Sequence, residues 1–485
     1  MKRDLTVLAG LLPAAVLFVC LGRAASQDWT PLFDGRSLSG WKASEHPESF
    51  RVEDGKIVCN GPSAHLYYVG DVAGADFKNF ELKAEVMTTP GANSGIYFHT
   101  EYREAGPPTK GYEAQINNTY VGHGYRELKK TGSAYGVRNQ YKSLAGDEQW
   151  FTMHVVVTGK RLRISVNDTL VVDYTEPAQP VRTEQPPLPD RLLSHGTFAL
   201  QCHDPESKVF YKSVLVKPLP EDVAVPPLDQ TVVDQPYLEI SRLQSIGFPL
   251  VDFHAHLKGG LTLEEVLEHS RKTGIAYGVA PNCGLGFPIT DDEGIDRFLE
   301  SMKGQPVFLG MQAEGREWVN LFSQEAIGKF DYVFTDAMTF TDDRGKRIHL
   351  WVDQEVEIDD KQAFMEMYVD RIVAILNEEP IDIFVNPTFL PGAIREEYDE
   401  LWTAERMERV IDAAAKNEIA IEINARYRIP GPAFIKRAKE AGVKLSFGTN
   451  NGGRDLGRLE YCLEMIKECG LTPGDMFMPT RTSAQ

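Results

Sequence analysis

The pattern of apolar residues changes once along this chain, near residue 218, and that change limits how the chain can fold. Residues 28–217 hold short runs in which apolar and polar residues alternate, as in 80–86, separated by turn residues. From about residue 245, apolar strand-like runs alternate with helical stretches. Strands alone favour a β-sandwich, whereas strand–helix repeats favour a parallel barrel. With 485 residues, the chain is long enough for both.

These patterns predict four segments. Residues 1–26 read as a signal peptide, because Lys2 and Arg3 precede an apolar run over 5–21 and small residues follow it. The alternative is a membrane anchor. An all-β sandwich is expected over 28–217, a Pro- and Asp-rich linker over 218–244, and an α/β TIM-like barrel over 245–475. The barrel's strands are predicted at 250–256, 276–281, 307–314, 332–338, 381–386, 419–424 and 443–450.

Composition excludes some partners and indicates a compartment. The formal net charge of −19 argues against nucleic acid or an anionic membrane surface as the main partner. After signal cleavage no segment is apolar and long enough to span a membrane, and the protein is expected to be periplasmic or secreted. The remaining cysteines are scattered, so we expect buried free thiols, although Cys59 and Cys202 can pair if the fold brings them together. Nothing in the sequence indicates an oligomeric state.

Three of the predicted sandwich strands direct polar groups to one side. Alternation within 96–99, 112–117 and 198–203 places these on shared faces: Tyr97 with His99, Glu113 with Gln115 and Asn117, and Gln201 with His203. Such side chains offer both hydrogen-bond donors and acceptors, as a polyhydroxylated ligand requires. The alternative is an ordinary solvated face.

Several motifs in this half carry a family resemblance. They are Leu32-Phe33-Asp34-Gly35, Leu38-Ser39-Gly40-Trp41, Phe50-Arg51-Val52-Glu53-Asp54-Gly55, Asn93-Ser94-Gly95-Ile96, Gly111-Tyr112-Glu113-Ala114-Gln115-Ile116 and Leu200-Gln201-Cys202-His203. Together they make residues 28–217 resemble the 3-keto-disaccharide hydrolase family, also described as 3-keto-glucoside lyase/hydratase. The resemblance implies a concanavalin-like jelly roll whose concave sheet binds an oxidised glycoside.

The same resemblance implies roles for individual residues. Elimination next to a sugar ketone needs a general base, donors for the enolate oxygen and an acid for the leaving group. We assign the carboxylate to Glu113, and acid/base or metal-binding roles to His99 and His203. The predicted substrate-binding residues are Asn93, Tyr97, Gln115, Asn117 and Gln201. The chain departs from the family at Asn117-Asn118, where an Asp is common, and after Ile96, where an Arg is common.

The barrel half contains a His-x-His pattern at a predicted strand end, Asp252-Phe253-His254-Ala255-His256. Because strand side chains alternate, both imidazoles lie on one face, and this arrangement often begins a divalent-metal site. The predicted metal ligands are His254, His256, Glu314 and Asp336, with the identity of the divalent metal left open. The alternatives are structural histidines and a simple ion pair between Glu314 and Arg316.

This half resembles the polymerase and histidinol phosphatase superfamily and, more distantly, the amidohydrolases. That superfamily's last motif usually reads Gly-Ser-Asp-x-His, whereas this chain has Gly448-Thr449-Asn450-Asn451-Gly452. Its mid-barrel histidine is also replaced around Met338. A full trinuclear zinc site is therefore not expected, since lost ligands lower metal affinity. Polar groups at other strand ends indicate an anionic or polyol ligand, with the candidates Glu422, Asn424, Arg426 and Asn450.

The combined hypothesis is an exported carbohydrate-active enzyme. Its sandwich cleaves or hydrates 3-keto-glycosides, and its barrel carries a second, altered metal or polyol site. One alternative makes the sandwich a non-catalytic carbohydrate-binding module attached to a metal-dependent barrel hydrolase. Another makes the chain a non-enzymatic recognition protein.

Overall fold

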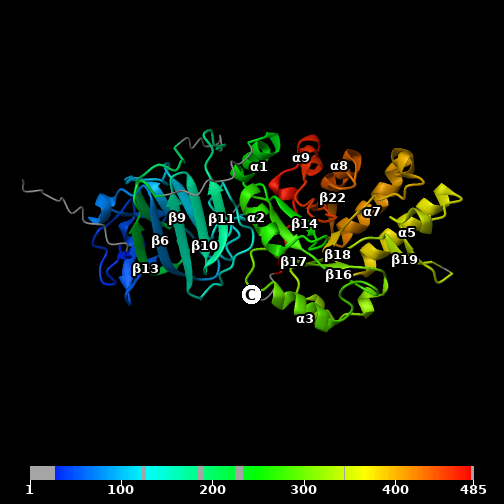
Figure 1. Cartoon of the computed structure of the whole chain (residues 1–485), viewed down its shortest axis with the longest axis horizontal. Coiled ribbons are helices and arrows are strands. Elements are labelled where there is room, and N and C mark those ends of the chain that lie inside the picture. Colours follow the sequence, from blue (N-terminus) through cyan, green and yellow to red (C-terminus); the bar gives the residue numbers. More distant parts are fainter. Residues whose placement is uncertain (1–27, 123–126, 183–189, 224–232, 343, 482–485) are drawn as a thin grey trace, which may run out of the picture.

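The computed structural model describes residues 28–122, 127–182, 190–223, 233–342 and 344–481. The predicted signal peptide lies outside these residues. In the described part of the chain, no helix combines the length and the apolar character needed to cross a membrane. A β-sandwich and a barrel lie side by side, with α1 and α2 close to the boundary between them (Figure 1). Both predicted architectures are therefore confirmed.

Two antiparallel sheets form the sandwich. One sheet has the order β11 (Thr169–Thr175), β10 (Arg161–Val166), β9 (Phe151–Thr158), β6 (Phe80–Thr88), β13 (Val209–Pro218), β4 (Lys56–Cys59) and β3 (Phe50–Glu53), with β1 (Thr30–Pro31) paired to β13. The other has the order β2 (Trp41–Ala43), β5 (Ala64–Tyr68), β12 (Thr197–Cys202), β7 (Asn93–Thr100) and β8 (Tyr112–Asn117).

Burial differs between the two sheets and shows where a site can lie. Strand β6 alternates buried and half-buried residues, as a sheet with one solvated face does. Strands β5, β12, β7 and β8 are instead buried at every position. One face of this second sheet packs into the core, where the Phe80 ring lies 5.9 Å from Phe98 and 4.9 Å from Phe198. Loops therefore cover its other face, which carries the polar side chains.

Seven parallel strands close the barrel. They are β14 (Val251–Ala255), β15 (Ala276–Val279), β17 (Phe308–Ala313), β18 (Tyr332–Thr335), β21 (Ile383–Phe384), β22 (Ala420–Asn424) and β23 (Leu445–Gly448). Pairing of β15 with β17 closes the ring. All seven lie within the predicted runs. Two short additions were not foreseen: β16 (Asn282–Cys283), which extends beside β17, and a hairpin of β19 (Thr339–Thr341) and β20 (Arg347–His349).

Helices surround the barrel and one of them precedes it. They are α1 (Gln235–Ser245), α2 (Leu263–Thr273), α3 (Asp292–Ser301), α4 (Gln324–Ile327), α5 (Lys361–Glu378), α6 (Tyr398–Leu401), α7 (Ala404–Lys416), α8 (Pro432–Glu440) and α9 (Glu460–Glu468). Thr262 and Glu265 form the predicted capping box of α2. The last part of the predicted linker is helical, since α1 begins at Gln235. The Asp234 side chain caps this helix by accepting a hydrogen bond from the Tyr237 N–H.

A segment of the sandwich closes the amino-terminal end of the barrel. The Tyr141 ring belongs to the apolar cluster that fills the barrel, and its hydroxyl donates to the Phe248 carbonyl at 3.0 Å. Lys142 and Asp331 form an ion pair of 2.8 Å, with side chains 7% and 0% exposed. The Asn139 amide N–H donates to the Gln244 side chain at 2.8 Å. Buried polar contacts thus hold the two halves together.

The cysteines are free. Cys59, Cys202, Cys283, Cys462 and Cys469 are all buried thiols. Burial raises the pKa of the Cys59 and Cys202 thiols. The expectation of buried free thiols is confirmed for the described residues.

Candidate functional site

The polar face of the second sandwich sheet forms a pocket of about 200 Å³. Its lining residues come from β7, β8, β12 and the loops above them: Asn93, Tyr97, Glu113, Gln115, Glu127, Tyr135, Arg191, Gln201 and His203. Six of the eight residues proposed from the sequence are therefore together in one place. Register explains this, since Tyr97 pairs with Glu113 on β8 and with Ala199 on β12.

Glu113 occupies the floor of the sandwich pocket. Only 4% of the residue is exposed. Burial raises the pKa of its carboxyl group, while the Arg191 guanidinium and a hydrogen bond from Tyr97 oppose that rise. The Arg191 Nη2 atom lies 3.8 Å from Glu113 Oε2. A buried carboxylate with a weakened preference for ionisation is a stronger base than an exposed one.

Gly95 makes room for this carboxylate. A Cβ atom at residue 95 would lie 2.3 Å from Glu113 Oε1 and 2.8 Å from Glu113 Cγ. No real contact is that short, so the absence of a side chain at residue 95 sets the position of Glu113.

Two amide side chains present unpaired oxygens in the pocket. Gln115 donates through Nε2 to Asn93 Oδ1 at 2.7 Å, and Gln201 donates through Nε2 to the Tyr97 hydroxyl at 3.4 Å. The Oε1 atoms of both glutamines are buried without a partner among the described residues. A buried acceptor without a donor is costly, and a ligand hydroxyl would supply that donor.

His203 is oriented by its neighbour in sequence. Its Nδ1 lies 2.7 Å from Asp204 Oδ2, which assigns the Nδ1 proton to this contact and leaves Nε2 as an acceptor. The side chain is 27% exposed and stacks edge-on against Tyr120 at 5.5 Å. Burial acts against ionisation of Asp204, but hydrogen bonds from His203 and Ser207 outweigh it and lower the pKa of that carboxyl. This pair can accept or deliver a proton at Nε2.

Sequence reasoning missed several residues of this site. Arg191, Glu127 and Tyr135 lie in irregular loops without periodicity, so no strand pattern marked them. His65 is different, because it alternates with Tyr67 on β5 and pairs with Gln201 on β12. Both ring nitrogens of His65 are buried without a partner in the described chain, and its ring lies 5.3 Å from Tyr97. The alternation of His65 and Tyr67 was a usable signal.

His99 does not belong to the pocket, which corrects its predicted catalytic role. The residue has φ of 57°, so the strand kinks there and the expected alternation with Tyr97 is lost. Its ring packs against Phe80 at 5.5 Å. Nδ1 accepts from the Ser194 N–H, and Nε2 donates to the Lys78 carbonyl. Burial lowers its pKa to about 4, so this is a neutral structural histidine.

Asn117 is also absent from the pocket, which corrects its predicted substrate-binding role. Its Nδ2 donates to the Lys129 carbonyl at 2.9 Å, and its Oδ1 accepts from Lys130 Nζ at 3.4 Å. The strand ends at this residue, and its side chain turns to hold the 129–131 loop. Asn117 therefore shapes the pocket only indirectly.

A second pocket, of about 240 Å³, lies at the carboxyl ends of the barrel strands. We call it the barrel pocket. Its lining includes His256, Glu314, Asp336, Arg426 and Asn450 from the predicted set, together with Lys258, Asn282, Phe287, Gln312, Met338, Trp351, Asn386 and Tyr427. Polar side chains dominate, which distinguishes it from the apolar interior of the barrel below.

Both histidines of the His-x-His pattern are held by their Nδ1 atoms. His254 Nδ1 lies 2.6 Å from Glu422 Oε1, and His256 Nδ1 lies 2.7 Å from the Ala280 carbonyl. His254 Nε2 is buried without a partner in the described part of the chain. Burial, followed by the neighbouring His254, lowers the pKa of His256 well below its usual value. His256 thus presents an unprotonated Nε2.

The two carboxyl groups are held by amides. Glu314 accepts from Asn282 Nδ2 at 2.7 Å, and Asp336 accepts from Asn386 Nδ2 at 2.9 Å. Burial, followed by the Asp336 charge, raises the pKa of Glu314 to about 8. Burial also raises the pKa of Asp336.

These residues do not fit a resident metal ion. Among the described residues, no three His, Cys, Asp or Glu side chains are grouped so that they could hold one. The His254 and His256 rings lie 5.1 Å apart, but a protein zinc site takes at least three protein ligands. The four side chains predicted as metal ligands share one end of the barrel without forming that set.

The remaining predicted barrel ligands divide into two kinds. Glu422 and Asn424 support the wall: Glu422 holds His254, and Asn424 Nδ2 donates to Glu422 Oε2 at 3.0 Å. Arg426 and Asn450 line the pocket, and Arg426 Nη1 donates to the Asn450 carbonyl at 3.0 Å.

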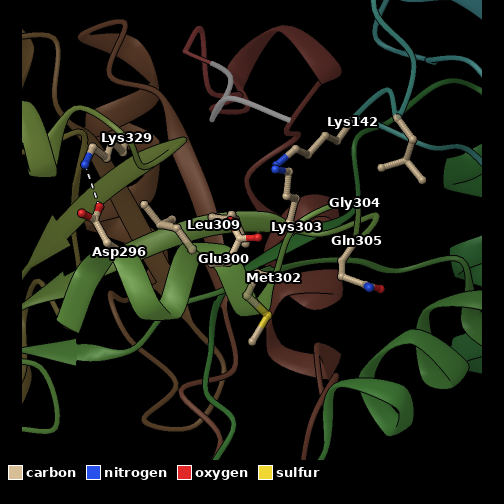
Figure 2. A pocket seen from close by; sticks show the side chains of 11 residues that line it. Lys142, Asp296, Glu300, Met302, Lys303, Gly304, Gln305, Leu309 and Lys329 are labelled. Atoms are coloured by element: carbon tan, nitrogen blue, oxygen red, sulfur yellow. Dashed lines mark hydrogen bonds and ion pairs between the residues drawn. The ribbon is translucent and has the colours of Figure 1, made fainter. Parts of the chain in front are cut away.

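A third, larger cavity of about 320 Å³ lies where the sandwich segment meets the amino-terminal end of the barrel. Figure 2 shows its lining, in which Lys329 reaches Asp296 from the neighbouring helix at 2.6 Å. Lys142 on its wall belongs to the ion pair with Asp331. Aliphatic parts of side chains form most of its walls. The Lys329–Asp296 and Lys142–Asp331 pairs use charged groups of its lining for structural contacts, so we assign this cavity no chemistry.

Comparisons with known proteins agree with the sandwich assignment. Residues 28–217 match the model of the 3-keto-alpha-glucoside-1,2-lyase-like domain. A 3-keto-disaccharide hydrolase of Bacteroides thetaiotaomicron is 35% identical over 74 residues, which is 14% of this chain and 26% of that protein. The match thus spans about a quarter of the curated relative.

Solved structures resemble each half. A candidate glycosyl hydrolase from Parabacteroides distasonis is 24% identical, with a TM-score of 0.34, over 40% of this chain and 94% of that chain. The carbohydrate-binding module CBM66 from Bacillus subtilis is 15% identical, with a TM-score of 0.26, over 37% and 95%. A histidinol phosphate phosphatase from Lactococcus lactis, complexed with zinc, L-histidinol and phosphate, is 14% identical, with a TM-score of 0.35, over 46% and 95%.

The family match and the relative support a carbohydrate-active function for the sandwich. Residues 28–217 of this chain are similar to the 3-keto-alpha-glucoside-1,2-lyase-like domain.

Proposed function

We propose that this chain is an exported enzyme that cleaves or hydrates 3-keto-glycosides in the sandwich pocket. The observation that carries the proposal is the buried Glu113 carboxylate beside the Arg191 guanidinium, within a pocket that also contains His203. These three groups match the needs of the reaction: a base, a cation for an enolate oxygen and a second proton carrier.

The proposed reaction begins with proton abstraction. The Glu113 carboxylate removes the proton from sugar C2, and the electron pair forms a C2–C3 enolate because C3 is a ketone. Arg191 stabilises the oxygen at C3. The enolate then re-forms the ketone and a C1–C2 double bond, while the C1–O bond breaks. The aglycone oxygen takes a proton from Nε2 of His203, which enters the cycle as the imidazolium ion beside Asp204.

Hydration completes the reaction in the same pocket. Water adds at C1 and a proton returns to C2, which gives the free 3-keto sugar. His203 accepts the water proton through Nε2, and the protonated Glu113 returns its proton to C2. Gln115 and Gln201, with unpaired oxygens, accept hydrogen bonds from ring hydroxyls. Each residue thereby returns to its starting protonation state.

The test follows release of the aglycone from a 4-nitrophenyl 3-keto-glucoside by the whole protein. Glu113→Gln is expected to lower kcat at least about a hundredfold, since general base catalysis contributes roughly 10²–10⁴. Glu85→Gln is the matched control, because Glu85 lies on β6 of the other sheet. Its carboxylate accepts hydrogen bonds from Lys212 and Ser213, which lie outside the pocket. Full activity in Glu113→Gln would remove this residue from the reaction.

We further propose that the barrel pocket is a second binding site, for a polyol rather than a metal ion. The alternative, a binding module serving a barrel hydrolase, is favoured only by the existence of this polar pocket. Under that alternative, Glu113→Gln would leave catalysis intact and substitutions in the barrel pocket would abolish it. The same assay therefore separates the two functions.

A further inference from the structure

The barrel pocket has the size and position of a small-ligand site. Its volume of about 240 Å³ is below the roughly 300–1,000 Å³ of drug-sized sites, which suits a single sugar ring. It lies at the carboxyl ends of the strands, which is the functional face of α/β barrels. The hairpin of β19 and β20 precedes Trp351, which reaches its rim.

One side of the barrel pocket is cationic. Lys258 follows β14 and is half-buried, and its ammonium group makes no hydrogen bond or ion pair with another described residue. Arg426 stands on the same pocket wall and uses Nη1 for the Asn450 carbonyl. An ammonium group beside a guanidinium is unfavourable, and the Asp455 and Glu314 carboxyl groups offset only part of that repulsion. This side is therefore suited to a carboxylate or phosphate group of a ligand.

One buried acceptor in the barrel pocket, the side-chain oxygen of Gln312, has no hydrogen-bond donor in the described chain. Gln312 on β17 is only 6% exposed, and its Oε1 atom is buried without a partner in the described chain. Its strand neighbour Asn282 already donates to Glu314 at 2.7 Å. Leaving a carbonyl oxygen unpaired is unfavourable, so a ligand hydroxyl that donates to it would be favoured.

Aromatic side chains also line the barrel pocket. Trp351, Tyr427 and Phe287 line the barrel pocket, and Trp351 is 41% exposed although it is a large apolar residue. Aromatic rings provide flat, rigid contact area that matches the C–H face of a sugar ring. A partly exposed tryptophan at the rim of a polar pocket is thus explained by a ligand that covers it.

We propose that the barrel pocket binds a monosaccharide-sized polyol that carries an anionic group, without a metal ion. Lys258 and Arg426 hold the anionic group, Gln312 accepts from a hydroxyl and Trp351 covers the ring. This inference deepens the second part of the proposed function and does not depend on the reaction in the sandwich.

Calorimetric titration of the whole protein tests this proposal with three probes: D-gluconate, D-glucose 6-phosphate and D-glucose. At least one anionic probe is expected to bind about tenfold more tightly than D-glucose, and the better of the two identifies carboxylate or phosphate as the anionic group. Lys258→Met should weaken that probe about tenfold or more, and Gln312→Leu should weaken all three. Retention of binding in EDTA is expected.

Two matched variants locate the binding. Lys303→Met makes the same substitution at an exposed residue near the other end of the barrel, after α3, and should leave affinity unchanged. Glu113→Gln should also leave it unchanged, which separates this site from the sandwich pocket. The proposal is overturned if neither anionic probe binds at about 10 mM, if EDTA abolishes binding, if Glu113→Gln abolishes it, or if Lys258→Met and Gln312→Leu both leave it intact.

Discussion

The substitution Gly95→Ala tests whether the position of the Glu113 carboxylate governs the reaction. The new Cβ atom would lie 2.3 Å from Oε1, 2.8 Å from Cγ and 2.9 Å from Cδ of Glu113. Ordinary van der Waals contact begins at 3.4 Å, so the carboxylate must move by about 1 Å. A displacement of about 1 Å at a reacting group costs roughly a hundredfold in rate, or about 2.7 kcal/mol of activation free energy.

The backbone itself tolerates this change. Gly95 does not have a positive φ, and alanine in a strand is favoured over glycine by roughly 0.5–1 kcal/mol in conformational entropy. We therefore expect kcat to fall about a hundredfold while the thermal midpoint of unfolding changes little. Gly474→Ala is the control, because a Cβ there meets nothing closer than 3.7 Å. The assay is release of 4-nitrophenol from the 3-keto-glucoside.

A double substitution decides whether the effect passes through Glu113. In a Glu113→Gln background, Gly95→Ala should lower the residual rate very little, because the group it displaces no longer acts as the base. An equal loss of rate in both backgrounds would show that residue 95 acts on another step. A wild-type rate in Gly95→Ala would refute the claim that the carboxylate must stay where the structure has it.

Three further outcomes are expected. Glu113→Gln should raise the thermal midpoint of unfolding at neutral pH, and this gain should disappear at acidic pH. The pKa of the Glu113 carboxyl is raised in the folded protein, so its ionisation costs stability as the pH rises through that pKa. Equal midpoints of the two proteins at neutral pH would contradict this. His99→Gln should leave kcat unchanged and make the free energy of unfolding less dependent on pH in acid. The pKa of His99 in the folded protein is about 4, below the ordinary 6.5. About 3 kcal/mol of folding free energy is therefore present above pH 6.5 and lost as pH falls toward 4. Lys142→Met should lower the free energy of unfolding, measured by urea titration, by roughly 3 kcal/mol, because it removes the ammonium partner of the buried Asp331. A change below about 1 kcal/mol would mean that this ion pair is exposed to solvent in solution.

Period-two alternation predicted most of the sandwich pocket and failed where the backbone left the regular strand. Glu113 and Gln115 share a face because β8 is regular there. His99 left that face because its φ of 57° breaks the alternation, and a single residue in that conformation has no reliable signature in sequence. Arg191 could not be predicted because it reaches Glu113 from a loop, and loop geometry depends on tertiary contacts.

The barrel shows the same division between strand pattern and contact. Seven apolar runs predicted seven strands, since buried parallel strands read as continuous apolar sequence. The predicted metal ligands do share one strand-end face, as alternation requires. The hydrogen bonds of these carboxylates were not visible in the sequence. Asn282 donates to Glu314 and Asn386 donates to Asp336, and only the three-dimensional structure reveals these contacts. Residue types alone therefore indicated metal ligands at carboxylates that the structure pairs with asparagine amides.

The segment between Glu127 and Lys142 links the two halves in a way that bears on function. Its first part lines the sandwich pocket through Glu127 and Tyr135. Its last part enters the base of the barrel, where Tyr141 joins the apolar interior and Lys142 pairs with Asp331. Because one segment of 16 residues serves both surfaces, the wall of the sandwich pocket is held in place by the barrel. The barrel thus has a structural role in the sandwich site whatever ligand it binds, and loosening Lys142 should weaken substrate binding before it alters the chemical step.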